Sequence, residues 1–262
     1  MRKGEWSYSR CRDCGLLSSE PIPSPQQIEE HYRTKFHAGN YETLRRYASQ
    51  YRHVYEQLAN WVAPKPGERI LDVGCFTGDL IEVLRSRGAD AFGLELQPEA
   101  VRIAQERMPG RVFQADVNGS QFPPGPYDTI TMMAVIEHVV DPVNFIRRAH
   151  SLLVPNGRLL LQTPDASSTL AHVMRSYWPP LAPIEHIHLF TRASMRTLLR
   201  DFGLTDVKFR SHVKTLPVGY IYENLNNFGP ELRWLFRPIH ALLGDAALPF
   251  YGGEMLVSAM KS

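Results

Sequence analysis

The chain has 262 residues, 44% of them hydrophobic, and its 29 Lys and Arg nearly balance 27 Asp and Glu, for a formal net charge of +2. This length predicts one sizeable α/β core with additions, and the near-neutral charge favours a small-molecule partner over nucleic acid. No segment reaches the roughly 20 apolar residues that span a bilayer, and the start lacks the apolar run of a signal peptide. With only three cysteines a disulfide framework is not expected, so we predict a cytoplasmic protein without a transmembrane segment.

Residues 1–40 are predicted to form a cysteine-containing appendage, and residues 41–262 the main domain. Cys11 and Cys14 are followed by "SSEPIPSPQQ", whose prolines and serines indicate an irregular connector before a helix. From Tyr41 to Val62 apolar residues recur at steps of three and four, which predicts an amphipathic helix.

Beyond "APKPGE", short β-rich runs alternate with helical patterns, which is typical of a parallel sheet covered on both faces. Strands are expected near Arg69–Val73, Ala91–Leu96, Arg111–Gln114, Thr129–Ala134 and Arg158–Gln162, and helices near Asp79–Arg87, Pro98–Arg107 and Pro142–Leu153. "VPNG", at Val154–Gly157, is expected to be a turn before the fifth strand. A helix at Arg192–Asp201, a strand near Asp206–Ser211 and a final strand in "GGEMLVSAMKS" complete the pattern and suggest a terminal antiparallel pair.

Between the last two strands lies an insertion, Val218–Gly253, that carries aromatic residues and apolar helix faces. It is too long for an ordinary hairpin loop, and such insertions are commonly lids or binding elements. A structural flap or a dimer surface is an equally open interpretation. Arg237 and His240 interrupt its apolar runs, which excludes membrane spanning but leaves interfacial contact open.

The turn "ILDVGCFTGDL", Ile70–Leu80, follows the first strand of the alternating region. Gly74 and Gly78 allow positive φ and close backbone approach by a ligand at the strand end. The spacing does not match the G-x-G-x-x-G of dinucleotide folds, and Asp72 would repel a pyrophosphate. The turn therefore predicts a different, cationic nucleotide-like ligand.

Acidic residues also end the next two strands. Glu95, followed by Leu96, lies where a carboxylate can accept from both hydroxyls of a ribose. Asp116 lies where a carboxylate can accept from an exocyclic amine, while the backbone NH of Val117 can serve a ring nitrogen. Three acids at three successive strand ends predict one nucleoside site.

The stretch "RILDVGCFTGDLIEVLRSRGADAFGLELQPEAVRIAQERM" resembles the first half of class I S-adenosylmethionine-dependent methyltransferases. The resemblance implies a Rossmann-like α/β fold with a seven-stranded, mostly parallel sheet, a terminal antiparallel hairpin and helical appendages. It implies S-adenosyl-L-methionine as cofactor, with the turn at the methionine part, Glu95 at the ribose and Asp116 at the adenine. Phe76 stands where many members have glycine, and we expect it to pack beside the methionine end.

The resemblance continues through "MMAVIEHVVDPVNFIRRAHSLLVPNGRLLLQTPD". It implies that Ala134 to His138 line the methionine end of the cofactor, with His138 chiefly in cofactor positioning. A further segment, "YWPPLAPIEHIHLFT", is similar to an element that follows the fifth strand in small-molecule methyltransferases, including those that methylate sugars. By that resemblance His186 would be the general base and Glu185 its partner or a second base. Histidine titrates near neutrality, which suits removal of a proton from an attacking hydroxyl or carbon.

No metal is predicted at the site, because no carboxylate spacing supports ligation by His186 and His188. The segment "CRDCGLLSSEPIPS" resembles half of the small zinc-binding segment that precedes some of these methyltransferases. The other cysteine pair is absent, so the segment is degenerate, has lost its partner pair, or is completed by His31 or His37.

These patterns predict a methyltransferase for a small molecule, a sugar or related metabolite, with its acceptor covered by the N-terminal helices and the insertion. Two alternatives stay open. One is a methyltransferase for a lipid-linked or aromatic acceptor, and the other is a non-catalytic S-adenosylmethionine-binding module. A homodimer is compatible with the apolar insertion.

Overall fold

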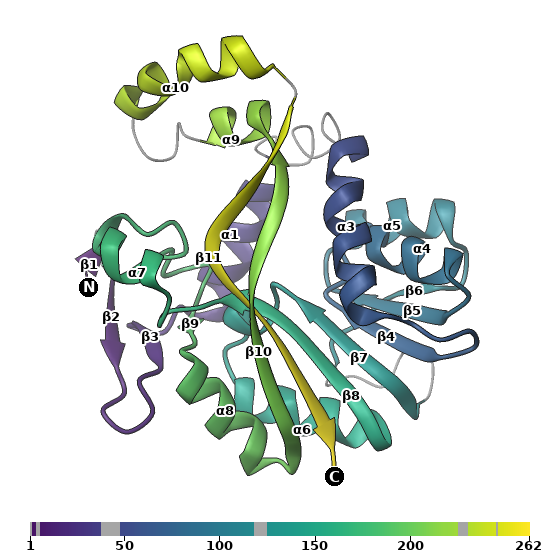
Figure 1. Ribbon diagram of the computed structural model, residues 1–262. Coiled ribbons are helices and arrows are strands. Elements are labelled where there is room, and N and C mark those ends of the chain that lie inside the picture. The colour runs from purple at the N-terminus through teal and green to yellow at the C-terminus, as the bar shows by residue number, and fades with distance from the viewer. Residues whose placement is uncertain (1, 4–5, 38–47, 118–124, 225–229, 245) are drawn as a thin grey trace.

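The structure is a computed structural model that describes the chain except residues 1, 4–5, 38–47, 118–124, 225–229 and 245. A seven-stranded sheet forms its centre, in the order β10-β11-β8-β7-β4-β5-β6 (Figure 1). Its strands are β4 (Arg69–Val73), β5 (Asp90–Glu95), β6 (Val112–Gln114), β7 (Tyr127–Met133), β8 (Leu153–Pro164), β10 (Leu204–Pro217) and β11 (Ala247–Lys261). Pairs among β8, β7, β4, β5 and β6 are parallel, and β11 pairs antiparallel with both β8 and β10. The Rossmann-like α/β fold and the terminal antiparallel hairpin are thus confirmed.

Helices cover both faces of this sheet. The helices are α3 (Ala48–Val62), α4 (Asp79–Ser86), α5 (Pro98–Arg107), α6 (Pro142–Leu152) and α8 (Arg192–Asp201). Apolar side chains of α3, α4 and α5 pack on one face with Ile70 and Ala91, and those of α6 and α8 pack on the other with Leu71 and Leu94. Because side chains alternate along a strand, neighbouring residues of one strand enter two different cores.

Every strand and helix predicted from Arg69 to Asp201 is observed, although the ends of several of them differ from the predicted bounds. β8 starts at Leu153 and so includes the expected turn at Val154–Gly157. Asn156 has a φ of 61° there and the pairing with β7 shifts register, so the turn is an irregularity at the start of the strand. The predicted helix at Tyr41–Val62 is observed from Ala48, and its first seven residues lie outside the described part.

The N-terminal segment forms a second, four-stranded sheet in the order β1-β2-β3-β9. Its elements are β1 (Arg2–Lys3), β2 (Trp6–Arg10), β3 (Leu17–Glu20) and β9 (His188–Leu189), and α1 (Pro25–His37) follows β3. The expected irregular connector is therefore wrong at its first residues, because Ser18 to Glu20 pair with β2. Since β3 also pairs with β9, the segment is joined to the main domain directly after the "EH" motif.

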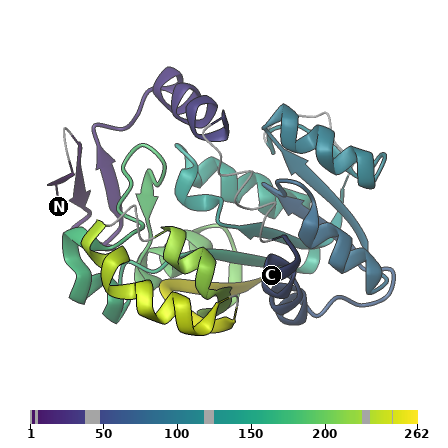
Figure 2. The ribbon, with the colours of Figure 1, turned by 90° about the horizontal axis from the view of Figure 1, so that it is seen from above.

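The segment between the last two strands is helical, as predicted, but shorter. α9 (Val218–Asn224) and α10 (Pro230–Leu243) lie between Pro217 and Ala247, which already pair across the hairpin. Residues 247–253 of the expected insertion therefore belong to β11. Viewed from above, α1 lies on one side of the molecule and the α9–α10 pair on the other (Figure 2).

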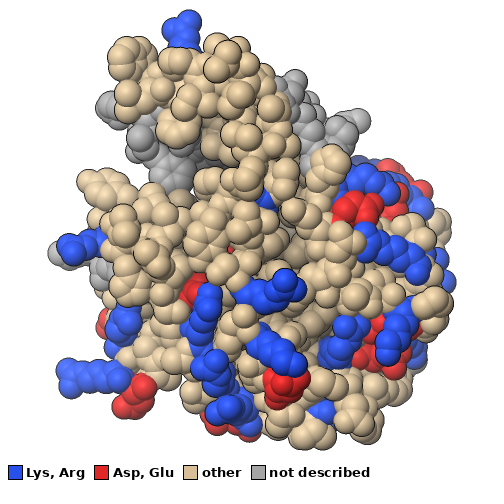
Figure 3. Space-filling model, viewed as in Figure 1, with Lys and Arg blue, Asp and Glu red and all other residues tan. Residues whose placement is uncertain are grey.

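Charge is distributed unevenly over the surface. In the space-filling view, Lys, Arg, Asp and Glu gather over the lower and right-hand parts. The described residues of α9 and α10, above the β10–β11 hairpin, show few charged side chains on this face (Figure 3). The remaining short helices, α7 (Thr169–Met174), η1 (Ile136–His138) and η2 (Arg175–Tyr177), lie in loops that follow β7 and β8. In the described residues, no helix is long and apolar enough to cross a membrane.

Candidate active site

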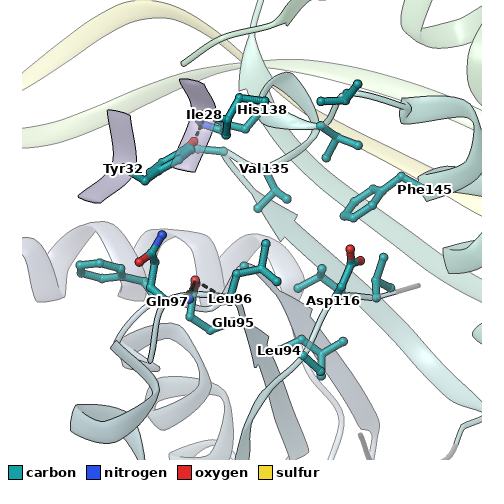
Figure 4. Close-up of a pocket in the computed structure, with 18 of the residues that line it drawn as sticks. Ile28, Tyr32, Leu94, Glu95, Leu96, Gln97, Asp116, Val135, His138 and Phe145 are labelled. Carbon is teal, nitrogen blue, oxygen red and sulfur yellow. Dashed lines mark hydrogen bonds between the residues drawn. The ribbon is translucent and has the colours of Figure 1, made fainter. Parts of the chain in front are cut away.

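A cavity of about 1640 Å³ opens at the carboxyl ends of the parallel strands and is lined on one side by α1. Its floor comes from the residues that end β4, β5, β6 and β7, namely Val73, Gly74, Leu94, Glu95, Ala115, Asp116, Met133 and Ala134. In Figure 4, Tyr32 and His138 lie across the cavity from Glu95, Leu96 and Asp116. Parallel sheets bind ligands at this edge, so the location agrees with the sequence prediction.

The glycine turn lies at the cavity wall and leaves no space for a side chain at its first glycine. Gly74 has a φ of 72°, and a Cβ there would lie 2.4 Å from Cγ2 of Val135, which lines the cavity. Phe76 also lines the cavity and has a φ of 49°, in the left-handed region that glycine tolerates best. Its backbone NH donates to Oε2 of Glu95 at 2.9 Å, which ties the turn to the next strand.

Two predicted cofactor residues lie behind this lining. Asp72 is 3% exposed and accepts a hydrogen bond from the Thr131 hydroxyl at 2.6 Å. Burial raises the pKa of Asp72 to about 7. Gly78 starts α4, and a Cβ there would lie 2.6 Å from Cε of Met108 on the side of α5. Both residues therefore support the turn from below, and direct contact with a cofactor stays a prediction.

The predicted nucleoside end of the cavity carries groups that suit such a ligand. Backbone NH groups of Leu96 and Gln97 donate to Oε1 of Glu95 at 2.7 and 2.9 Å, so the carboxylate is held in place. A carboxylate offers about four acceptor positions, and with one NH on Oε2 this oxygen can still accept from a hydroxyl. Leu96 is 62% exposed and lines the cavity together with the buried Val117. An apolar surface open toward the cavity is suited to cover a flat ring.

These observations fit S-adenosyl-L-methionine. The turn leaves no room for a side chain at residue 74, a fixed carboxylate faces the cavity at the expected ribose position, and Asp116 lies at the next strand end. The chemistry that the cofactor supplies when bound is an electrophilic methyl group on a sulfonium. The residues of the chain bind it, orient it and exclude water.

The far end of the cavity holds a cluster of hydrogen-bonded side chains around His138. Nδ1 of His138 lies 2.8 Å from the Tyr32 hydroxyl and 2.8 Å from the backbone oxygen of Glu185. A carbonyl oxygen can only accept, so Nδ1 carries the proton in the neutral ring and Nε2 is the atom able to take one. Tyr32, His138 and Glu185 all line the cavity.

His186 lies one layer further back. Its ring meets that of His138 edge to face with centroids 4.9 Å apart, and its Nδ1 lies 2.7 Å from the Pro180 oxygen. The Tyr8 hydroxyl donates to the backbone oxygen of His186 at 2.6 Å. Unlike Glu185, His186 is not among the residues that line the cavity.

His188 does not share the direction of His186. It is 8% exposed, and its two ring nitrogens lie 3.0 Å from the Ser18 hydroxyl and 3.2 Å from the Val140 oxygen. Burial lowers its pKa. His188 therefore joins β9 to the N-terminal sheet and to the loop after β7, which is a structural role.

Glu137 reaches the same cluster from below. It is 1% exposed, accepts from the Thr163 hydroxyl at 2.9 Å, and has Oε1 3.9 Å from Nε2 of His138. Burial raises the pKa of Glu137 to about 8. Ligand-type atoms of Glu137, His138 and His186 lie within 4.8 Å of one another, so the two "EH" motifs meet in space although the spacing within each motif predicted no such group.

The sequence predicts that N-terminal helices cover the acceptor, and α1 does line the cavity, but Tyr32 was not predicted as a residue of the site. Ile28 and Tyr32 lie four residues apart on α1 and both line the cavity. That spacing puts them on one helix face, which is a readable signal. It could not indicate what the face contacts, because α1 reaches the cavity only through the packing of the N-terminal sheet.

The cysteine segment lies apart from this site. Cys11 and Cys14 belong to a turn that is closed by a hydrogen bond from the Cys11 NH to the Leu16 oxygen, at 2.8 Å. His31 lies instead with Nε2 3.8 Å from Oε2 of Glu185, and the His37 side chain lies outside the described part. Among the described residues, no group of three metal-binding side chains includes either cysteine.

Comparison with known proteins places this geometry in context. The family model "Methyltransferase domain" matches residues 43–208. The chain is 36% identical over 150 residues to a ubiquinone biosynthesis O-methyltransferase of Xanthomonas euvesicatoria, covering 53% of this chain and 63% of the relative. It is 31% identical over 163 residues to the same enzyme of Leptothrix cholodnii, covering 55% and 69%. The match to the first of these relatives thus spans less than two thirds of its length.

Solved structures agree in fold. The magnesium protoporphyrin IX methyltransferase of Synechocystis, solved with bound S-adenosylhomocysteine, superposes with a TM-score of 0.58 at 19% identity, covering 90% of this chain and 100% of that one. A methyltransferase of Archaeoglobus fulgidus gives a TM-score of 0.56 at 16% identity, covering 79% and 93%. At such identities these likenesses support the fold alone.

Proposed function

Because the chain belongs to the family of class I S-adenosylmethionine-dependent methyltransferases, we propose that it transfers the methyl group to an oxygen of a small acceptor held beside His138. The observation that carries this proposal is the pair of contacts to Nδ1 of His138, from Tyr32 and Glu185 at 2.8 Å each. These contacts orient the ring with its proton on Nδ1, so Nε2 is the basic nitrogen of the neutral ring and would accept the proton that an attacking hydroxyl must lose.

In this proposal the base role predicted for His186 passes to His138, since His138 lines the cavity and His186 packs behind it. His186 and Glu185 are then positioning residues. His186 holds the ring from one side, and the backbone oxygen of Glu185 fixes its tautomer. Glu137, 3.9 Å from Nε2, favours the protonated ring once its own carboxyl ionises.

For the acceptor, we favour an aromatic or lipid-linked hydroxyl compound over a sugar. The relatives in Xanthomonas and Leptothrix are named as O-methyltransferases of ubiquinone biosynthesis, and no sugar appears in those names. The cavity supports this class as well, because Ile28, Val140 and Phe145 contribute apolar wall beyond the cofactor residues. A sugar acceptor stays the competing proposal from the sequence.

The test has two parts. Calorimetry with S-adenosylmethionine and its demethylated product should give binding to the wild type, to His138→Ala and to His186→Ala within a few-fold of one another. Turnover should then be measured on phenols with and without a long hydrocarbon tail and on nucleotide sugars. We expect activity on a phenol, abolished in His138→Ala and only reduced in His186→Ala. The reverse order of the two variants would return the base role to His186, and activity on nucleotide sugars alone would refute the acceptor class.

A further inference from the structure

Helix α10 carries its large apolar side chains on the outside of the molecule. Trp234 is 72% exposed, Leu235 59% and Leu242 84%. Phe236, Ile239 and Leu243 are also exposed, by 38%, 42% and 37%. Single exposed apolar residues are ordinary, but a contiguous group of this size on one helix indicates a contact surface.

The polar side of the same helix faces the protein. The Arg233 guanidinium lies over the Tyr222 ring of α9, 4.8 Å from its centroid. His240, about two turns later, stacks on that ring with centroids 4.5 Å apart and planes 10° from parallel. The orientation of α10 is thus set by its cationic side, and the apolar side is left without cover by any described residue of the chain.

The apolar side is wider than a protein partner needs. At about 100° per residue, the exposed side chains from Trp234 round to Phe236 cover an arc of roughly 200°. An amphipathic helix that packs on protein usually buries a stripe of little more than roughly 100°. A solvent-like apolar medium, in contrast, can cover the whole arc at once.

The surroundings extend this surface. Leu248 and Phe250, near the start of β11 and shortly after the end of α10, are each 39% exposed. α10 lies at the far end of the β10–β11 hairpin, beyond the body of the molecule, and the view of that end is nearly all uncharged (Figures 1 and 3). Arg237 is the exposed charge at the border of the apolar arc, while the Glu231 and Asp245 side chains of this segment lie outside the described part.

We propose that this surface docks on a phospholipid bilayer, with α10 lying in the plane of the interface. We define the docking surface as Trp234, Leu235, Phe236, Ile239, Leu242, Leu243, Leu248 and Phe250. A Trp, Phe and Leu face opposite an Arg-bearing face is the pattern of helices that lie in the headgroup region. The exposed Arg237 beside the apolar arc favours a bilayer that contains anionic lipid.

The docking surface connects with the candidate active site through the hairpin. Glu254 of β11 accepts from the side-chain amide of Gln162 at 2.6 Å, and the backbone oxygen of Gln162 accepts from the Ala134 NH at 2.9 Å. In a docked molecule, the β10–β11 hairpin would therefore connect the lipid surface with the end of the cavity that holds His138. This proposal goes beyond the proposed function and does not depend on it, because it concerns binding to lipid in the absence of cofactor and acceptor.

The experiment is co-sedimentation of the full chain with vesicles of phosphatidylcholine, with and without phosphatidylglycerol. We expect the wild type to sediment with the mixed vesicles and its tryptophan fluorescence, to which the exposed Trp234 contributes, to shift to shorter wavelength. The double variant Leu235→Glu, Leu242→Glu should partition at least about tenfold less. The matched control is Val143→Glu on α6, a helix that lies at the end of the molecule away from α10 (Figure 1). Val143 is 44% exposed, and this variant should sediment like the wild type.

Three results would overturn the proposal. The first is a wild type that stays in the supernatant with both vesicle types. The second is an equal loss of binding in Val143→Glu. The third is a wild-type dimer in solution that the double variant converts to monomers, which would make the docking surface an interface between two copies of the chain. Circular dichroism and S-adenosylmethionine binding verify that each variant is folded, so a failure of the proposed function would appear as lost turnover with vesicle binding intact.

Discussion

Substitution of Gly74 tests whether the glycine turn forms the cavity wall as described. In Gly74→Ala, two costs add. A non-glycine residue at positive φ costs about 1–2 kcal/mol, and the new Cβ would lie 2.4 Å from Cγ2 of Val135. Relieving that overlap by moving Val135 costs about 1–3 kcal/mol more, as overpacking in a core does.

The chain offers a matched control in Gly67. Its φ is 76°, close to the 72° of Gly74, but no heavy atom lies within 4 Å of the position of an added Cβ. Gly67→Ala therefore carries the backbone cost alone. The difference between the two variants in the free energy of unfolding, measured by urea denaturation, isolates the overlap, since the gain from a stiffer unfolded chain is common to both.

Val135→Ala completes a double-mutant cycle, because it removes the methyl group that the new Cβ would meet. We expect the double variant Gly74→Ala, Val135→Ala to be more stable than the sum of the single effects by about 1–3 kcal/mol. Affinity for S-adenosylmethionine, measured by calorimetry, should fall about tenfold or more in Gly74→Ala and stay unchanged in Gly67→Ala. Equal destabilisation by the two glycine variants, or no rescue by Val135→Ala, would refute the described wall.

Three further predictions concern the polar groups of the site. Burial raises the pKa of Glu137 from an ordinary 4.5 to about 8, so the free energy of unfolding should fall as the pH rises from about 4.5 to 8. Glu137→Gln should flatten this slope in urea titrations across the same pH range. For Glu254, burial raises the pKa, but Lys214 and His212 outweigh burial and lower the pKa to about 2, so the stability that the carboxylate contributes above about pH 4.5 is lost as the pH falls toward 2. Glu254→Gln should flatten this acid limb of the urea titrations, and an unchanged limb would contradict the assigned pairing. Tyr32→Phe removes the hydroxyl at His138 but keeps the ring, and we expect about a tenfold loss of kcat with an altered pH–rate profile and unchanged cofactor affinity; a loss of cofactor affinity instead would make Tyr32 a cofactor-binding residue.

The order of strands and helices was readable from the sequence, because local signals set it. Strand β4 and helices α5 and α8 have the predicted bounds, since each is a run of matching periodicity bounded by a glycine, a proline or a capping residue. The residues predicted to bind the cofactor do line one cavity, because Gly74, Glu95 and Asp116 lie at or just after the ends of parallel strands, and parallel strands end at one edge. Periodicity failed at Val154–Gly157, where an irregular strand start contains the turn residues, and at Ser18, whose pairing partners are distant in the chain.

The arrangement of side chains around His138 was decided by the tertiary structure. Tyr32, His138 and Glu185 come from three segments separated by more than forty residues, and no periodicity records which side chains such segments bring together. The sequence indicated histidines of the right chemistry, and only packing distinguished His138 at the cavity from His186 behind it and His188 in the N-terminal sheet. The same holds for α10, whose composition is that of a buried amphipathic helix. Its apolar side faces outward because Arg233 and His240 pack on Tyr222, a contact that depends on the position of α9 rather than on α10 itself.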